Sequence, residues 1–255
     1  MKNNQTIYQK QKTSPLFSNV PLVLVFVIFG LFNYTNLSAQ PETITADRPG
    51  AAEGTHAVTP GIFYIELGYQ YSFRDNFKMS SVPDVNFRFG LVDRVEMFIM
   101  WDGVNILHDI DDTELELPGI GGKYRLVMAD EFNLTLLGAV EFSDDDGFSA
   151  EPLLALAWDY ELSDNLELFG TGLTQYDGDD FEFLFVLGLE VEATDKIGVF
   201  AEYYFTDMGT DKLFHGSEYG IMYLLTDDIQ IDVYGGYGFS EEIAHYLGFG
   251  VSKRF

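Results

Sequence analysis

Charged side chains alternate with apolar ones along much of the chain after Gly61. In "FEFLFVLGLEVE", residues 181–192, Glu182 and Glu190 stand opposite a row that includes Phe185 and Leu187. Charges withdrawn from bulk water must pair or stay hydrated. The charged face therefore indicates either an internal network of salt bridges or a water-filled path that selects solutes. Its predicted members are Glu66, Arg74, Arg88, Glu96, Lys123, Arg125, Glu141, Glu182, Glu190, Glu202 and Asp232.

Residues suited to catalysis are few. The chain has no cysteine, which excludes thiol catalysis, disulfides and Cys-ligated metals. Among the histidines His56, His108, His215 and His245, His215 lies in a predicted loop two residues before Ser217. A Ser–His site also needs an orienting acid within reach, and the sequence places none there. We therefore do not expect an enzyme, and an outer-membrane enzyme barrel is the third hypothesis.

Two aspartate clusters, Asp111–Asp112 and Asp144–Asp146, are candidates for divalent cations. Both lack the glycine and terminal glutamate spacing of an EF-hand loop. They are interpreted as solvated acidic loops, and neither a metal nor a cofactor is expected.

The apolar period of two predicts β-strands. Residues 181–192 and 197–205 show an alternation that runs over about 8–12 residues at a time, as in strands. Such strands exceed the 5–6 residues usual in soluble sheets and match the ~9–11 residues of a tilted membrane-spanning strand. No stretch of 18 consecutive apolar residues occurs, so we expect any crossing of a membrane by the mature chain to use strands.

A short turn motif recurs about every 31 to 37 residues, in "VDRVEM", "ADEFNL", "SDNLEL", "TDKIGV" and "TDDIQI". Longer, mostly acidic connections alternate with these turns. This alternation is typical of up-and-down outer-membrane barrels, whose short turns face the periplasm. The fold class predicted is all-β, a transmembrane antiparallel barrel over residues 61–255. Its twelve strands are expected at about 61–73, 80–91, 94–105, 117–128, 132–142, 149–161, 165–175, 181–192, 197–207, 217–225, 229–238 and 244–255.

Residues 1–39 have the composition of a secretory signal peptide. Lys2, Lys10 and Lys12 precede the apolar run "VPLVLVFVIFGLF", and "NLSAQ" offers small residues for cleavage after Ala39. The apolar run is about 13 residues long, short of the ~20 that a spanning helix needs. This length disfavours the alternative of a membrane anchor.

The charge balance excludes one class of partner. Lys and Arg number 14 against 41 Asp and Glu, a formal net charge of −27 that cleavage after Ala39 would change to −30. Binding of nucleic acid phosphates needs a basic surface, so nucleic acid is not an expected partner. Because rings of Asp and Glu repel anions, any conductance is predicted to favour cations.

The segment "ITADRPGAAEGTHAVTPG", residues 44–61, is polar and too irregular for a helix or strand. With short turns on the periplasmic side, it begins at that mouth of the barrel. Arg48 has a planar fork that can pair with a lumen carboxylate, and Pro49 and Pro60 stiffen the chain. We expect residues 40–60 to form a small plug in which Asp47 and Arg48 take part. The alternative is a loose periplasmic tail.

Two features carry a family resemblance: Asp47–Pro49 with residues 59–61 and Glu66, and the end "SKRF". On these residues the mature chain resembles the meta-pathway phenol-degradation family of outer-membrane transporter-like β-barrels. The resemblance implies a transporter-like barrel for small solutes, with aromatic or other hydrophobic compounds as the implied class. Phe255 at the end of an alternating strand also resembles the signal by which the barrel-assembly machinery recognises its substrates.

The sequence thus predicts a channel or transporter for small solutes in the outer membrane of a Gram-negative bacterium, in contact with outer-membrane lipid. The main alternative is a closed structural or adhesive barrel that presents acidic loops.

Overall fold

The structure is a computed structural model that describes residues 43–75, 77–143, 148–176, 178–207, 213–240 and 242–255. The predicted signal peptide, residues 40–42 and the cluster Asp144–Asp146 lie outside the described residues. In the described part of the chain no helix is long and apolar enough to cross a membrane.

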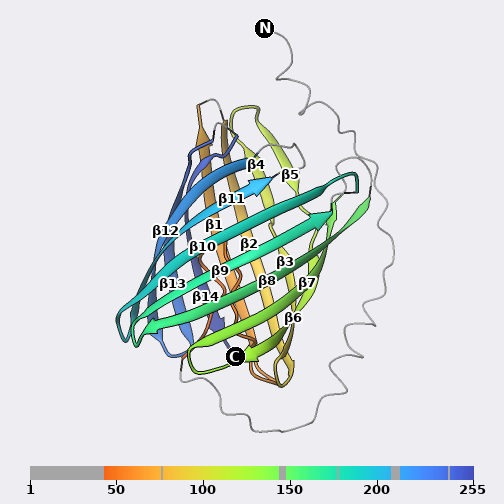
Figure 1. The fold of residues 1–255 in the computed structure, drawn as a ribbon. Coiled ribbons are helices and arrows are strands. Elements are labelled where there is room, and N and C mark those ends of the chain that lie inside the picture. The colour runs from red at the N-terminus through yellow and green to blue at the C-terminus, as the bar shows by residue number, and fades with distance from the viewer. Residues whose placement is uncertain (1–42, 76, 144–147, 177, 208–212, 241) are drawn as a thin grey trace.

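The strands form one antiparallel sheet that closes on itself, because β1 pairs with both β14 and β2 (Figure 1). Within the described residues they are β1 (Phe63–Arg74), β2 (Phe77–Val92), β3 (Val95–Trp101), β4 (Val104–Leu107), β5 (Asp112–Leu115), β6 (Gly119–Met128), β7 (Phe132–Ser143), β8 (Ser149–Ser163), β9 (Leu166–Tyr176), β10 (Phe181–Thr194), β11 (Ile197–Asp207), β12 (Leu213–Thr226), β13 (Ile229–Gly238) and β14 (His245–Arg254). β4 and β5 form a hairpin, and β4 pairs with the N-terminal part of the long strand β2. The closed wall therefore has twelve strands, and the predicted all-β barrel is confirmed.

Two predicted boundaries are wrong. The strand expected at 94–105 breaks after Trp101, because Gly103 has a φ of +71° and lies against the carbonyl of Pro83, where a side chain has no room. The chain then re-pairs with β2 as β4, and β5 falls in the expected loop. β12 begins at Leu213, so His215 lies in a strand and not in a loop.

In two of the short turns the first residue of the motif is a threonine whose side chain closes the turn. The Thr194 hydroxyl accepts a hydrogen bond from the backbone N–H of Lys196 (3.2 Å), and Thr226 does the same for Asp228 (3.3 Å). Such local side-chain bonds satisfy turn donors and stop the strand. The first strand begins and the last strand ends at this short-turn end, where the Phe255 ring stacks on that of Phe63 with centroids 4.6 Å apart.

The two faces of the wall differ as the alternation predicts. Outward side chains such as Phe185 and Leu187 are 46% and 43% exposed, whereas Glu66 and Arg88 on the inner face are buried. An apolar outer face and a polar inner face suit a barrel whose outside meets lipid.

We predict that Leu187→Arg destabilises the barrel by about 2–4 kcal/mol, because it puts a charge at mid-height on the lipid face. The free energy of unfolding in phospholipid vesicles, followed by tryptophan fluorescence, measures the effect. The matched control is Glu190→Arg on the same strand but the inner face, which should cost far less. Equal losses for the two variants would contradict the assignment of faces.

Candidate functional site

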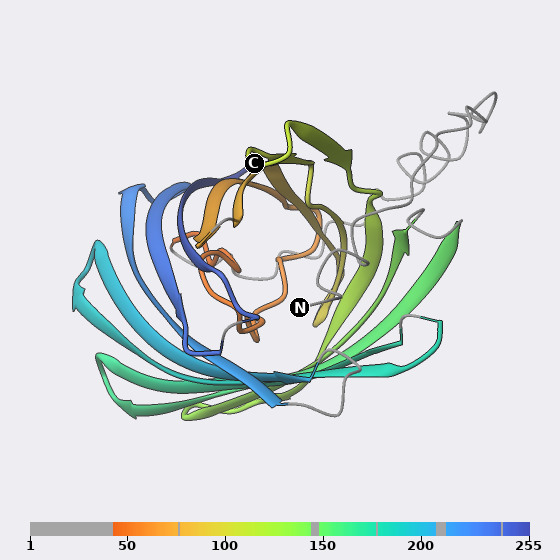
Figure 2. The same cartoon turned by 90° about the horizontal axis from the view of Figure 1, so that it is seen from above.

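Residues 43–62 lie inside the ring of strands (Figure 2). The segment starts at the short-turn end, where the Ile44 N–H donates to the carbonyl of Asp227 (2.8 Å). It returns to that end before β1, where the Gly61 N–H donates to the carbonyl of Gly90 (2.9 Å). Between these anchors it crosses the lumen and contacts opposite walls.

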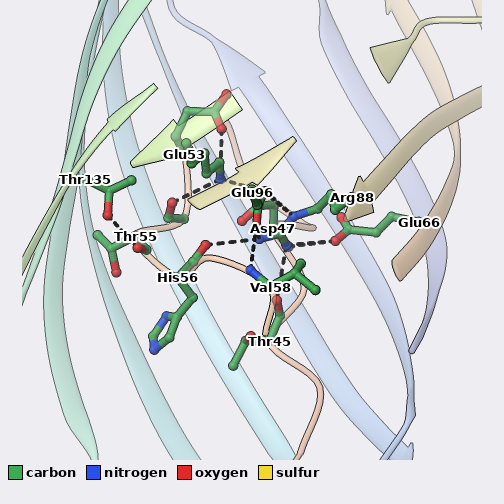
Figure 3. A network of polar contacts seen from close by, with 12 residues as sticks. Thr45, Asp47, Glu53, Thr55, His56, Val58, Glu66, Arg88, Glu96 and Thr135 are labelled. Atoms are coloured by element: carbon green, nitrogen blue, oxygen red, sulfur yellow. Dashed lines mark hydrogen bonds and ion pairs between the residues drawn. The ribbon is translucent and has the colours of Figure 1, made fainter. Parts of the chain in front are cut away.

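Arg88 on β2 forms the centre of the contacts with one wall (Figure 3). Its guanidinium donates to both oxygens of Glu96 on β3 (2.9 Å each) and to Glu66 on β1 (3.0 Å). Asp47 of the inner segment lies 3.1 Å from Arg88 Nε. Arg88 is only 1% exposed, so these three carboxylates replace the water that would otherwise solvate its charge.

The backbone of the segment completes the same cluster. Arg88 donates to the carbonyls of Thr45 and His56, at 3.1 Å each. The Val58 N–H donates to Glu96 (2.7 Å). The two limbs of the looping segment are therefore held by one side chain.

Lys123 on β6 binds the segment next to this cluster. Its ammonium donates to Asp47 (2.5 Å) and to the carbonyl of Gly54 (3.0 Å), and lies 3.4 Å from Glu53. The Asp47 N–H donates to Glu66 (3.1 Å). Asp47 thus joins both buried cations of this wall.

Arg48 points the other way and pairs with Asp84 on β2 and, at 3.6 Å, with Asp232 on β13. Its guanidinium lies 5.6 Å from the ring centroid of Tyr234, and its carbonyl accepts from Gln230 (2.9 Å). Burial alone would lower the pKa of Arg48, but the two carboxylates outweigh it and hold the pKa above its usual value. Arg48 is therefore a fixed cation.

The opposite wall also binds the segment, through polar side chains near mid-height or toward the short-turn end. The contacts are Ala51 N–H to Glu202 (2.5 Å), Glu53 N–H to Thr171 (2.9 Å), the Thr55 hydroxyl to Asp159, and the Thr135 hydroxyl to the Thr55 carbonyl (2.5 Å). A segment without secondary structure cannot satisfy its own backbone. Lumen side chains supply the partners instead.

The remaining predicted site residues lie on the inner face, and one of them, Arg125, is joined to this network through Asn133, which donates to Asp159 (2.8 Å). Arg74 donates to the carbonyls of Ser240 and Ile243 at the long-loop end. Glu141 accepts from Gln175 (2.7 Å), which stands opposite Glu182 in the sheet. Arg125 donates to Asn133 (3.0 Å) near the short-turn end, and Glu190 lines the cavity described below.

Several residues of the network were not predicted: Glu53, Asp84, Thr135, Thr171 and Gln230. Thr135 and Thr171 are fully buried, yet an uncharged threonine in a strand gives no sequence signal of its partner. Glu53 and Asp84 could have been suspected from the excess of acids, but nothing in their spacing points to Lys123 or Arg48.

The inner face also carries apolar side chains. Phe98, Leu137, Ala139 and Ala155 form a buried apolar cluster on β3, β7 and β8. Leu137 stands directly opposite Lys123 in the sheet, so the cluster shares the inner face with the charged residues. The lumen therefore has an apolar patch beside a polar network.

A cavity of about 510 Å³ remains between residues 43–56 and the inner side of β8–β13. It reaches the β10–β11 turn at Asp195 and Lys196, at the short-turn end of the barrel. Its volume is in the range of small-molecule sites.

The nearest approach to a catalytic pair is Ser80 Oγ and His108 Nε2, 2.8 Å apart. Ser80 also bonds the Tyr69 hydroxyl (3.1 Å). No orienting carboxylate or amide bonds His108 among the described residues, and a Ser–His site needs such a group. In the same part of the chain no cluster of His, Asp or Glu could hold a metal ion.

Comparison with known proteins relates the fold to outer-membrane channels. No family model matches the chain, and no curated protein matches it. An outer membrane channel from Pseudomonas putida F1, described as COG4313, has a TM-score of 0.61 at 13% identity over 82% of this chain and 99% of that chain. A KdgM porin has a TM-score of 0.56 at 9% identity over 74% and 99%. At these identities the fold is shared: this chain has the fold of outer-membrane β-barrel channels.

We predict that Arg88→Met lowers the free energy of unfolding by about 3–5 kcal/mol, because it leaves Glu66 and Glu96 without their buried cation and Asp47 with Lys123 alone. Unfolding in vesicles, followed by tryptophan fluorescence, measures this loss. Arg94→Met is the control, since Arg94 pairs with Asp93 at the exposed rim and such pairs contribute about 0–1 kcal/mol. A loss at Arg88 no larger than at Arg94 would refute the central role of Arg88.

Proposed function

We propose that the protein is an outer-membrane channel for small solutes whose lumen is narrowed by residues 43–62 acting as a plug. The observation that carries the proposal is the cavity of about 510 Å³ beside the segment in a closed wall of twelve strands. A barrel with a purely structural role needs no such space. The shared fold with outer-membrane channels agrees with this proposal.

The contacts of the segment support the role of a plug. They are hydrogen bonds and ion pairs to β1–β3, β6–β9, β11 and β13. Ile44 and Val58 of the segment also pack with Tyr64 of β1 in a buried apolar cluster. The plug is therefore bound to the wall by both polar and apolar contacts.

The solute class is part of the proposal. The resemblance to the phenol-degradation family implies aromatic or other hydrophobic compounds, and the apolar patch around Phe98 and Leu137 would suit them. We further propose that the short-turn end faces the periplasm and that Phe255 serves the barrel-assembly machinery.

Single-channel conductance in planar bilayers tests the proposal. Steady ion conductance is expected from a channel. A barrel that conducts no ions, either with the plug or without it, would favour the closed structural or adhesive alternative.

We predict that deletion of residues 43–55 increases conductance severalfold, because it removes the chain that crosses the lumen. Arg48→Ala should give a smaller increase, since it removes only the pairs with Asp84 and Asp232. Asp93→Asn at the rim is the control and should leave conductance unchanged. Unaltered conductance in the deletion variant, with the barrel assembled, would exclude a plug.

We also predict that the channel prefers cations, since carboxylates outnumber cations on the inner face of β8–β12 and repel anions. The reversal potential in a KCl gradient reports this preference. A reversal potential of the anion-selective sign would overturn it.

A further inference from the structure

Three of the four histidines of the chain, His108, His215 and His245, lie at the long-loop end of the wall. His245 continues the outward row of β14, two positions before the exposed Leu247. His215 is paired with the outward Phe205 of β11. An aromatic girdle at a membrane surface consists of Tyr, Trp and Phe. Such a girdle does not by itself explain why basic rings gather there.

The outward faces of β14, β1, β2 and β4 join two of these histidines to a lysine. Phe73 of β1 stands directly opposite His245 on one side and Lys78 of β2 on the other, so all three side chains point outward. The His108 N–H donates to the Lys78 carbonyl (2.9 Å), and His108 Nε2 lies 2.8 Å from Ser80 Oγ on the same face of β2. Because neighbouring strands are about 4.8 Å apart, Lys78, His108 and His245 span about 15 Å along the wall. These three residues are called the basic patch.

The basic patch has donors that the protein itself does not use. Lys78 is exposed, and its ammonium has no acidic partner in the described part of the chain. His245 Nδ1 accepts from the Gly238 N–H (3.2 Å), which places the proton of the neutral ring on Nε2. That nitrogen has no partner among the described residues. The rings of Tyr237 and Phe73 lie against His245, with centroids 4.3 Å and 5.8 Å away, and hold it in this orientation.

The surroundings of the basic patch match those of a lipid headgroup. Below it, the outward residues Leu247 and Phe249 of β14 are apolar and exposed, as on a wall that meets lipid tails. The nearby acids Asp75, Asp109 and Glu242 lie in connections beyond the strand ends and not on the wall. The basic patch therefore lies between the apolar wall and the loops. In a chain with a formal net charge of −27, this outward group of basic side chains indicates an anionic partner.

We propose that the basic patch binds a phosphate group of a lipid in the outer leaflet. Lys78 supplies the charge, His245 Nε2 donates to a phosphate oxygen, and the acyl chains of the lipid lie on the apolar wall below. Lysines near a membrane surface attract anionic headgroups, and the long stem of Lys78 lets its ammonium reach them. The inference goes beyond the proposed channel function. It uses only the proposed direction of the barrel, in which the long loops face the exterior of the cell.

Lipid binding to the detergent-purified full chain, measured by native mass spectrometry, tests the inference. The two probes are lipid A with its phosphates and the same lipid with the phosphates removed. The phosphorylated form is expected to bind at least about fivefold more tightly, the effect of one cation close to a charged headgroup. In Lys78→Gln/His245→Gln this preference should disappear. Both residues lie on the outside of the wall, so the variant should fold, and the mobility shift on heating in gels verifies this.

The matched control is Arg94→Gln/Lys253→Gln, which removes two exposed cations at the short-turn end. It should keep the preference for the phosphorylated lipid. Equal binding of the two lipids by the unaltered chain, or an equal loss in both double variants, would overturn the inference. Inorganic phosphate that competes as strongly as the lipid would indicate an ion site and overturn the lipid assignment. A barrel that binds selectively but conducts no ions would refute the channel alone, whereas a conducting barrel without the preference would refute the lipid site alone.

Discussion

A guanidinium without water must find its acceptors inside the protein, and the burial of Arg88 imposes this requirement on the whole lumen. Among the described residues of the wall, Glu66 and Glu96 are its carboxylate partners. The remaining partners come from the segment before β1, through Asp47 and two backbone carbonyls. The path of that segment through the lumen is therefore set largely by one buried charge.

The segment, in turn, needs hydrogen-bond partners from the wall. Its irregular backbone has donors and acceptors that no helix or sheet satisfies. Side chains of the lumen, such as Thr171 and Glu202, take the place of a regular ladder. Much of the polarity of the inner face thus serves to hold the segment.

The lumen has unlike parts. The apolar cluster around Leu137 lies beside Arg88 and Lys123, and the acidic cavity lies toward the short turns.

The sequence by itself determined the number of strands in the wall and the face on which each charge lies. Both depend on local rules: a period of two, and a recurring turn motif in which Asp follows a small or β-branched residue. Glu66, Arg88 and Lys123 could therefore be placed on one face without a structure. The apolar members of that face, such as Leu137, could not be separated from lipid-facing leucines, because both are simply apolar.

Only the tertiary structure decided which of these residues meet. Antiparallel pairing sets β1, β2, β3 and β6 side by side, so Glu66, Arg88 and Glu96 come from separate strands to one point. Lys123 lies 76 positions from its partner Asp47, and Glu202 lies 151 positions from its partner Ala51. At such separations the spacing of two residues in the sequence carries no information about whether they are in contact. Thr171 is the clearest example of a contact that the sequence does not reveal. A threonine in a strand fits the same alternating sequence pattern whether its side chain faces water or the backbone of a distant segment.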